Sequence, residues 1–166
     1  MSRLFIAIRL SDEMKKAIMQ TLHEMKKGGI KGGFVPVENL HVTLAFIGES
    51  RQAREISEAL STVQFKSFKL TMDDLGCFGD LLKVGIKGNQ GLTGLARSVR
   101  SALDGAGVAY DTKKFTPHIT MIRSLSGNWK AFPAPKGEMM VKSFSLMKSE
   151  MKNGKRVSTE VERFGI

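Results

Sequence analysis

Two tetrapeptides, His41-Val42-Thr43-Leu44 and His118-Ile119-Thr120-Met121, share one pattern, a histidine two residues ahead of a threonine in an apolar run. Alternating apolar and β-branched residues predict a strand, in which side chains i and i+2 lie on the same face. Each imidazole is therefore expected beside a hydroxyl group, and the residues between them are expected to point into a core.

The two motifs are 77 residues apart, and the same spacing relates other parts of the chain. Apolar runs begin at Leu4 and at Leu81, and the helix-like segments 12–27 and 92–104 each precede a glycine. A strand–helix–strand unit is thus used twice, and internal repetition changes how a whole fold is interpreted. Two copies related by a pseudo-twofold axis would place the motif strands on opposite walls of one groove.

Hydrophobic periodicity predicts the remaining elements. We expect strands over 3–9, 65–77, 81–87, 139–150 and 156–164, motif strands within 34–48 and 113–123, helices over 12–27, 51–63 and 92–104, and a loop over 27–33. Asn153-Gly154, between the last two strands, is a strong signal for a β-hairpin. Helices mixed with hairpin-connected strands predict the α+β class.

Composition predicts one soluble domain spanning 1–166. At 42% hydrophobic and 25% charged residues the chain is ordinary for a globular protein, and no segment approaches the ~20 continuous apolar residues of a membrane span. The opening residues run straight into a strand pattern without a secretory signal. Cys77 is the only cysteine, which excludes an intramolecular disulfide. We therefore expect a cytoplasmic protein with no membrane partner.

Net charge is the one unusual feature of the composition. The chain has 26 basic and 16 acidic residues, a formal charge of +10, and the segment from Lys113 onward contributes +7 of it. Excess basic charge favours anionic partners, nucleic acid first. Solvated surface lysines are the alternative explanation, and charge alone does not separate the two.

Two imidazoles, each beside a hydroxyl donor, suit acid–base chemistry on a phosphate ester. A single His-x-Thr in a strand is more often a core imidazole, but two copies at equivalent positions of a duplication favour catalysis. Neither motif has a second histidine, cysteine or carboxylate at metal-ligand spacing, so no metal is expected. No nucleophile-elbow pattern supports a serine-type triad.

The segments Glu38–Gly48 and Phe115–Arg123 resemble the two signatures of the 2H phosphoesterases. The chain is similar in particular to the RNA 2′,3′-cyclic phosphodiesterases, also called 2′-5′ RNA ligases, and the similarity extends to the opening strand Arg3–Leu10 and the closing segment 149–164. The resemblance implies a single catalytic domain with two pseudo-symmetric lobes. It implies antiparallel sheets flanking a central groove, with helices on the outer faces.

The resemblance also implies a reaction, the hydrolysis of an RNA 2′,3′-cyclic phosphate end to a 2′-phosphomonoester without a cofactor. By analogy with the family, His41 is the general acid (proton donor) and His118 the general base (proton acceptor). Thr43 and Thr120 would donate to the non-bridging phosphate oxygens. An exchange of the two histidine roles in the bond-forming direction would give 2′-5′ RNA ligase activity.

Three further residues are candidates for substrate contacts. Arg123 could neutralise phosphate, although its odd offset from His118 puts it on the opposite face of a regular strand. Phe115 and Phe34 could stack on a base, and core packing is the competing explanation for both. The expected partners are RNA with 2′,3′-cyclic phosphate ends, such as tRNA fragments, or nucleoside cyclic phosphates, bound by a monomer.

Two alternative functions remain open at this level. One is a 2H phosphodiesterase that acts on small cyclic nucleotide phosphates and uses the same histidines. The other is a non-catalytic RNA- or nucleotide-binding module that retains the groove. Both histidines and both threonines are intact, which argues against the second alternative.

Overall fold

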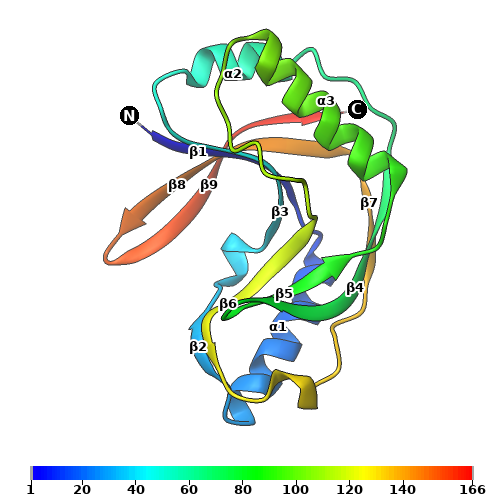
Figure 1. The fold of residues 1–166 in the computed structure, drawn as a ribbon, viewed down its shortest axis with the longest axis vertical. Helices are drawn as coiled ribbons and strands as arrows, with labels where there is room; N and C mark the ends of the chain where they lie inside the picture. Colours follow the sequence, from blue (N-terminus) through cyan, green and yellow to red (C-terminus); the bar gives the residue numbers. More distant parts are fainter. Residues whose placement is uncertain (1, 166) are drawn as a thin grey trace.

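Two antiparallel sheets form the framework of the protein, shown in Figure 1 as a computed structural model that describes residues 2–165. The strand order is β3-β1-β8-β9 in the first sheet and β2-β6-β5-β4-β7 in the second. The strands and helices are β1 (Ser2–Arg9), α1 (Asp12–Lys27), β2 (Lys31–Phe34), β3 (His41–Ser50), α2 (Ala53–Leu60), β4 (Phe68–Phe78), β5 (Leu81–Ile86), α3 (Gln90–Gly105), β6 (His118–Ser126), β7 (Glu138–Val141), β8 (Ser143–Lys152) and β9 (Lys155–Gly165), with 3-10 turns η1 (Val37–Asn39) and η2 (Trp129–Ala131).

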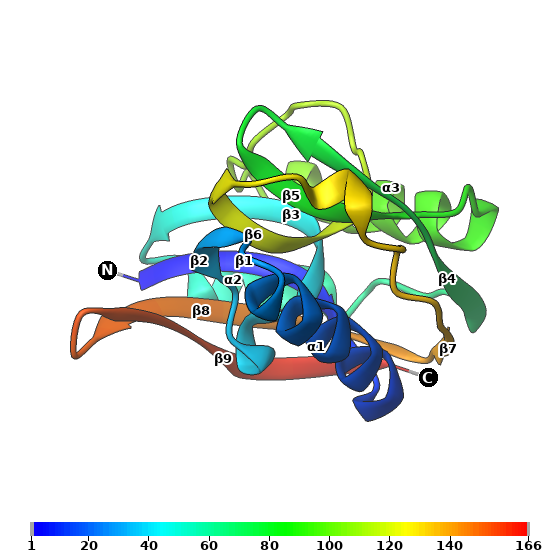
Figure 2. The ribbon, with the colours of Figure 1, turned by 90° about the horizontal axis from the view of Figure 1, so that it is seen from below.

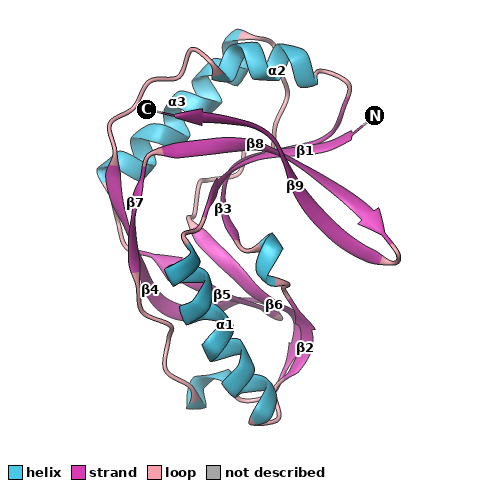
Figure 3. Cartoon of the chain, turned by 180° about the vertical axis from the view of Figure 1, so that it is seen from behind, coloured by secondary structure: helices cyan, strands magenta, loops and turns pink. Residues whose placement is uncertain are grey.

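The predicted duplication and the α+β class are confirmed. The units β1–α1–β3 and β5–α3–β6 follow the same course, and each pairs its first and last strands side by side in one sheet. Each helix packs on the sheet built by the other unit. Helix α3 contacts β3 of the first sheet, whereas α1 lies against the second sheet, as Figure 3 shows from behind. This exchange joins both sheets through one continuous hydrophobic core.

Local sequence explains where the paired helices begin. The Ser11 hydroxyl accepts a hydrogen bond from the Met14 amide at 3.2 Å, and Asn89 accepts from Leu92 at 3.1 Å. Both caps satisfy amides that a helix N-terminus leaves unpaired. One side of α1 buries Met14, Ile18, Leu22 and Met25, and α3 buries Leu92, Leu95, Val99 and Leu103, which fixes both helices on their sheets.

The segment predicted as one strand over 139–150 is two strands. β7 pairs with β4 in the second sheet, and after a break at Lys142 β8 pairs with β1 and β9 in the first. Both halves have strand composition, so periodicity alone does not show that the chain changes sheets. The short edge strand β2, in the segment predicted as a loop, is likewise held by pairing with β6.

The β8–β9 hairpin is confirmed, and it projects from the rest of the molecule in Figures 1 and 2. Asn153 and Gly154 at its tip have φ angles of 51° and 76°, the positive values that a two-residue turn of this hand requires. Within residues 2–165, no helix is both long and apolar enough to cross a membrane.

Candidate active site

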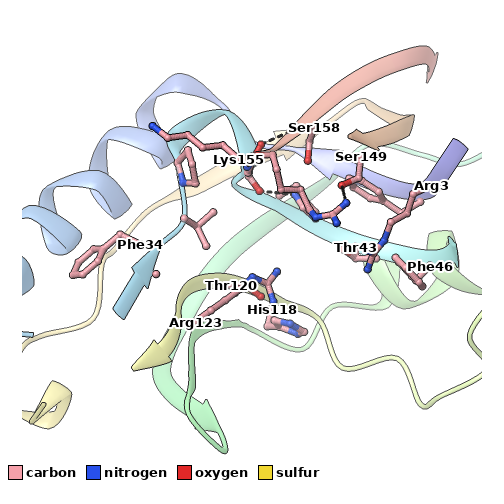
Figure 4. Close-up of a pocket in the computed structure, with 17 residues that line it drawn as sticks. Arg3, Phe34, Thr43, Phe46, His118, Thr120, Arg123, Ser149, Lys155 and Ser158 are labelled. Carbon is pink, nitrogen blue, oxygen red and sulfur yellow. Dashed lines mark hydrogen bonds between the residues drawn. The ribbon is translucent and has the colours of Figure 1, made fainter. Parts of the chain in front are cut away.

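The two motif strands bring both histidines and both threonines to one groove between the sheets. The groove has a volume of about 530 Å³, and Figure 4 shows Thr43 on one wall opposite His118 and Thr120 on the other. His41 lies on the same wall as Thr43. The residues between them, Val42 and Ile119, are completely buried, as strand alternation predicts.

Each imidazole is held by the carbonyl group two residues before it. The Nδ1 atom of His41 lies 2.6 Å from the Asn39 carbonyl oxygen, and that of His118 lies 2.7 Å from the Thr116 carbonyl oxygen. A carbonyl oxygen only accepts, so Nδ1 carries the proton in both rings. The Nε2 atoms are therefore left to take or give a proton, and this arrangement is repeated across the 77-residue duplication.

The two histidines have different surroundings. The His41 ring packs at 4.8 Å between centroids against Phe5, itself a buried residue of β1. Removal from water lowers the pKa of His41 to about 4; the Asn39 hydrogen bond opposes this change, and the positive charges of Arg123 and His118 add to it. His41 is therefore neutral near pH 7 in the absence of a ligand. The neighbour of His118 is Phe78, which meets it edge-on and is 46% exposed.

A β-bulge in each motif strand changes which later residues face the groove. Along β1 and β3 the register passes from Ala7↔Thr43 to Ile6↔Ala45, so that Leu44 has no partner. Such an extra residue reverses the alternation of faces beyond it. Phe46 consequently lines the groove together with His41 and Thr43.

The same bulge in β6 explains the position of Arg123. The register passes from Lys83↔Thr120 to Leu82↔Ile122, which leaves Met121 unpaired. Arg123, expected on the opposite face of a regular strand, therefore lines the groove (Figure 4).

The hairpin β8–β9 and strand β1 supply a third side of the groove that sequence patterns did not indicate. Asn39 connects this side to the first motif, because its side chain donates to the Arg156 carbonyl at 2.9 Å and accepts from the Ser158 amide at 3.1 Å. The Arg156 guanidinium donates to the Ser149 hydroxyl at 2.9 Å, a bond drawn in Figure 4. Asn39 therefore both positions His41 and holds the hairpin against the groove.

The groove is positively charged. Its described lining contains four cations and no carboxylate: Arg3, Arg123, Lys155 and Arg156. Arg3 also lies 5.4 Å above the ring of Phe46, which places a cation and an aromatic surface side by side. Such a lining attracts an anionic ligand and offers a face on which a base can stack.

The two phenylalanines predicted as base contacts have different positions. Phe34 lines the groove, with Lys26 5.9 Å above its ring. The structure does not bring Phe115 into the groove. Phe115 lies before the start of β6, packs against the core and contacts Arg100 in a separate depression beside α3. Phe46 is an aromatic residue of the groove that the prediction missed. The spacing of the repeat could have indicated it, since Phe46 lies 77 positions before Arg123, which was a candidate.

Potential metal ligands do not converge in the described part of the chain. Among residues 2–165, no three His, Cys, Asp or Glu side chains lie close enough to hold one ion. Cys77 is half-buried and unpaired within the same residues.

Known proteins resemble the chain in both sequence and structure. Residues 8–87 match the family model described as LigT like Phosphoesterase. The RNA 2′,3′-cyclic phosphodiesterase of Archaeoglobus fulgidus is 33% identical over 89% of this chain and 90% of its own length. That of Escherichia coli is 30% identical over 99% and 96%.

Solved structures agree with these sequence matches. The crystal structure of E. coli LigT complexed with 3′-AMP superposes with a TM-score of 0.82 and 29% identity, covering 99% of this chain and 97% of that one. Another phosphoesterase crystal structure gives a TM-score of 0.83 at 26% identity, with 99% and 98% coverage.

Proposed function

Because this chain belongs to the 2H phosphoesterases, in the family of LigT-like RNA 2′,3′-cyclic phosphodiesterases, we propose that it hydrolyses RNA 2′,3′-cyclic phosphate ends to 2′-phosphomonoesters. The observation that carries this proposal is the pair of imidazoles, each held through Nδ1 by a backbone carbonyl. Two Nε2 atoms in one cationic groove can serve the attacking and the leaving oxygen of a single phosphate.

In the proposed mechanism, His118 is the proton acceptor and His41 the proton donor. His118 Nε2 takes a proton from the attacking water, the phosphorus–O3′ bond breaks, and His41 Nε2 protonates the departing 3′ oxygen. Histidine suits both tasks because its ordinary pKa lies near ~6.5. Positioned proton transfer of this kind contributes about 10²–10⁴-fold to a rate.

The assignment of His41 as donor places a demand on the substrate. With a pKa of about 4 in the absence of ligand, His41 carries no proton to give at neutral pH. A phosphate anion between the two imidazoles stabilises the charged form, which raises the pKa again. Substrate binding would thus favour protonation of His41, which then acts as the donor, while His118 must remain neutral to act as the base.

Thr43 and Thr120 are the proposed donors to the non-bridging phosphate oxygens. Both hydroxyls lie on the groove face beside their histidines, and neither donates a hydrogen bond to another described protein group. They are therefore available to stabilise the charge that grows on these oxygens in the transition state. Arg123 would add a positive charge from the same wall.

The same groups can join two RNAs when a 5′-hydroxyl takes the place of water. His118 would accept the proton of that hydroxyl as it attacks the cyclic phosphate, His41 would protonate the departing 3′ oxygen, and the product would be a 2′-5′ phosphodiester. The two histidines would exchange roles when this bond is cleaved again. We include this reversible ligase activity in the proposal. No metal ion or cofactor is assigned a role in either direction.

For the natural substrate we propose RNA ending in a 2′,3′-cyclic phosphate, including tRNA fragments, with nucleoside cyclic phosphates as the simpler alternative. The +10 charge supports the longer ligand. We propose further that the chain acts in the cytoplasm as a monomer and as a single catalytic domain of two pseudo-symmetric lobes. The continuous core between the sheets supports the single domain.

The decisive assay is incubation of the protein with adenosine 2′,3′-cyclic phosphate, with and without a chelator. We expect adenosine 2′-phosphate at equal rates in both. The 3′ isomer would contradict the assignment of leaving group, and loss of activity in the chelator would indicate a metal-dependent hydrolase. Binding without turnover would indicate the non-catalytic module.

A further inference from the structure

Phe78 is a large apolar side chain left exposed beside a proposed catalytic histidine. It is 46% exposed at the end of β4, and its ring centroid lies 5.2 Å from that of His118 at an interplanar angle of 80°. An exposed aromatic face next to a reacting group is available for stacking, which every nucleobase accepts.

Lys83 completes a platform with Phe78 on the face of the second sheet that carries the motif. Lys83 pairs with Thr120 across β5 and β6 and with Gly76 across β5 and β4, and directly opposed residues lie on the same face. The Lys83 Nζ atom is 5.1 Å from the Phe78 ring centroid. A cation, an aromatic ring and a catalytic imidazole are therefore neighbours on one surface.

Two glycines give the platform its shape. A Cβ atom on Gly76 would lie 3.3 Å from Lys83 Nζ, and one on Gly85 would lie 3.6 Å from it. Because neither residue has a side chain, the Lys83 ammonium lies close to the sheet beside Gly76 and beside Gly85, the residue paired with His118. Lys83 forms no salt bridge with a carboxylate of residues 2–165, although the Asp73 side chain also lies near Gly85.

The platform is held in place at the β4–β5 turn. Gly79 adopts a φ of 61°, which permits the tight turn. The Leu125 amide donates to the Asp80 carbonyl at 2.8 Å, which ties the turn to β6, the strand of His118. The backbone of the turn that follows Phe78 is thus joined to the strand of the imidazole.

We propose that Phe78 and Lys83 bind a second nucleotide, the one whose 5′-hydroxyl lies beside His118. This inference rests on the proposed function, in which His118 takes the proton of the attacking oxygen. The 3′ oxygen of the nucleoside that carries the cyclic phosphate faces His41, on the other wall of the groove. The attacking nucleotide must therefore approach over the platform, with its base on Phe78 and its 3′-phosphate near Lys83.

The bonds balance without a further reactant. The 5′ oxygen forms a bond to phosphorus while the phosphorus–O3′ bond breaks. The proton of the 5′-hydroxyl passes to His118 Nε2, and His41 gives a proton to O3′. The reverse reaction cleaves a 2′-5′ dinucleotide into a cyclic phosphate and a 5′-hydroxyl. Hydrolysis places only water on the His118 side, so the platform has a nucleotide to hold only in joining or in 2′-5′ cleavage.

The test compares two substrates in each variant. We would measure kcat/KM for cleavage of adenylyl-2′,5′-adenosine and for hydrolysis of adenosine 2′,3′-cyclic phosphate, and take their ratio. Any general disturbance of His118 changes kcat/KM for both reactions, so it cancels in their ratio. For Phe78→Leu, which keeps an apolar side chain but lacks the aromatic face, the ratio should fall about 5- to 100-fold, the usual range for one stacked base. Phe78→Tyr should restore the ratio.

Lys83 is tested with a second pair of substrates. Lys83→Met should lower the ratio for a 2′-5′ dinucleotide that ends in a 3′-phosphate and leave it unchanged for the dinucleotide without that phosphate. Lys130→Met is the matched control, since Lys130 also lies over an aromatic ring, Trp129, but that ring packs on the hydrophobic core and not on a motif histidine. This variant should keep the wild-type ratio with both dinucleotides.

Several outcomes would overturn the platform. Equal ratios in Phe78→Leu and the wild type would do so, as would a wild-type enzyme that hydrolyses the cyclic phosphate but does not cleave the dinucleotide. A rise in KM for cyclic phosphate hydrolysis as large as the loss in dinucleotide cleavage would instead assign Phe78 to the first nucleoside. If the wild type fails to hydrolyse the cyclic phosphate itself, the proposed function is wrong, and the platform is rejected with it.

Discussion

Leu44 and Met121, 77 residues apart, are each the extra residue of a β-bulge directly after the threonine of a His-x-Thr motif. In both strands the bulge turns the second residue beyond it, Phe46 in one copy and Arg123 in the other, toward the groove. The bulge is thus repeated on both walls, while the side chain at this position differs: Phe46 presents an aromatic ring and Arg123 a positive charge.

This relationship leads to a prediction for Arg123. Its charge lowers the pKa of His41, so Arg123→Gln should raise that pKa, measured by NMR titration of the imidazole. The same variant should lose about 10- to 100-fold in kcat/KM, because a charged contact to phosphate is removed. Arg123→Lys should leave the pKa nearly unchanged. Arg97→Gln, at an exposed site on α3, is the control; an equal loss there would indicate a nonspecific charge effect.

The proposed acid–base pair gives a second prediction. His41→Ala and His118→Ala should each lower turnover of a nucleoside 2′,3′-cyclic phosphate by about 10²–10⁴-fold, with circular dichroism unchanged. His23→Ala removes the remaining histidine, an exposed residue of α1, and should retain full activity. Near-normal turnover in either groove variant would show that its imidazole transfers no proton.

The threonines are tested by removing only the hydroxyl. Thr43→Val and Thr120→Val keep the β-branched shape that the strands favour. Each should slow turnover by on the order of 10²-fold, the usual loss of one donor to a developing oxyanion. Thr→Ser at the same positions should recover much of this loss. If the Val and Ser forms are equally active, the threonines serve only as strand residues.

Burial of His41 predicts how stability depends on pH. Its pKa falls from 6.5 to about 4 on folding, so between these values the unfolded chain binds a proton that the folded protein does not. The contribution is complete above about pH 6.5 and is lost as the pH falls toward 4, by up to about 3 kcal/mol. Urea unfolding from pH 4 to 8 should therefore show a flatter profile for His41→Gln than for the wild type.

A ligand should change that titration. Inorganic phosphate in the groove should raise the pKa of His41, because the anion stabilises the imidazolium. NMR titration with and without phosphate measures this directly. An unchanged pKa of His41 at saturating phosphate would contradict the proposal that His41 becomes protonated when the substrate binds.

The basic surface separates an RNA enzyme from a small-molecule one. Each phosphate of a single strand contributes about −0.7 to the slope of log affinity against log salt, so three or four contacts predict a slope near −2 to −3. We expect kcat/KM for an oligoribonucleotide with a cyclic phosphate end to fall steeply with salt, and the mononucleotide value to change little. Parallel, shallow slopes would mean that the enzyme contacts only the terminal nucleotide.

The sequence by itself determined the repeated elements and the pairing of each motif histidine with a threonine on one face of its strand. The spacing of 77 residues can be counted directly in the sequence. The cap at Ser11 and the Asn153-Gly154 turn are local patterns, which depend on backbone geometry that neighbouring residues set. Strand alternation was sufficient to put each histidine beside its threonine, since only two residues separate them.

Only the tertiary structure decided which other residues join this site. Arg123 reaches the groove because pairing with β5 leaves Met121 out of register, and Asn39 and Arg156 meet across 117 residues because the hairpin packs on the first motif. Phe115, close to His118 in sequence, lies elsewhere because the strand has not yet begun. Bulges, sheet membership and contacts between distant segments depend on which strands pair, and pairing is a property of the whole fold rather than of any short stretch.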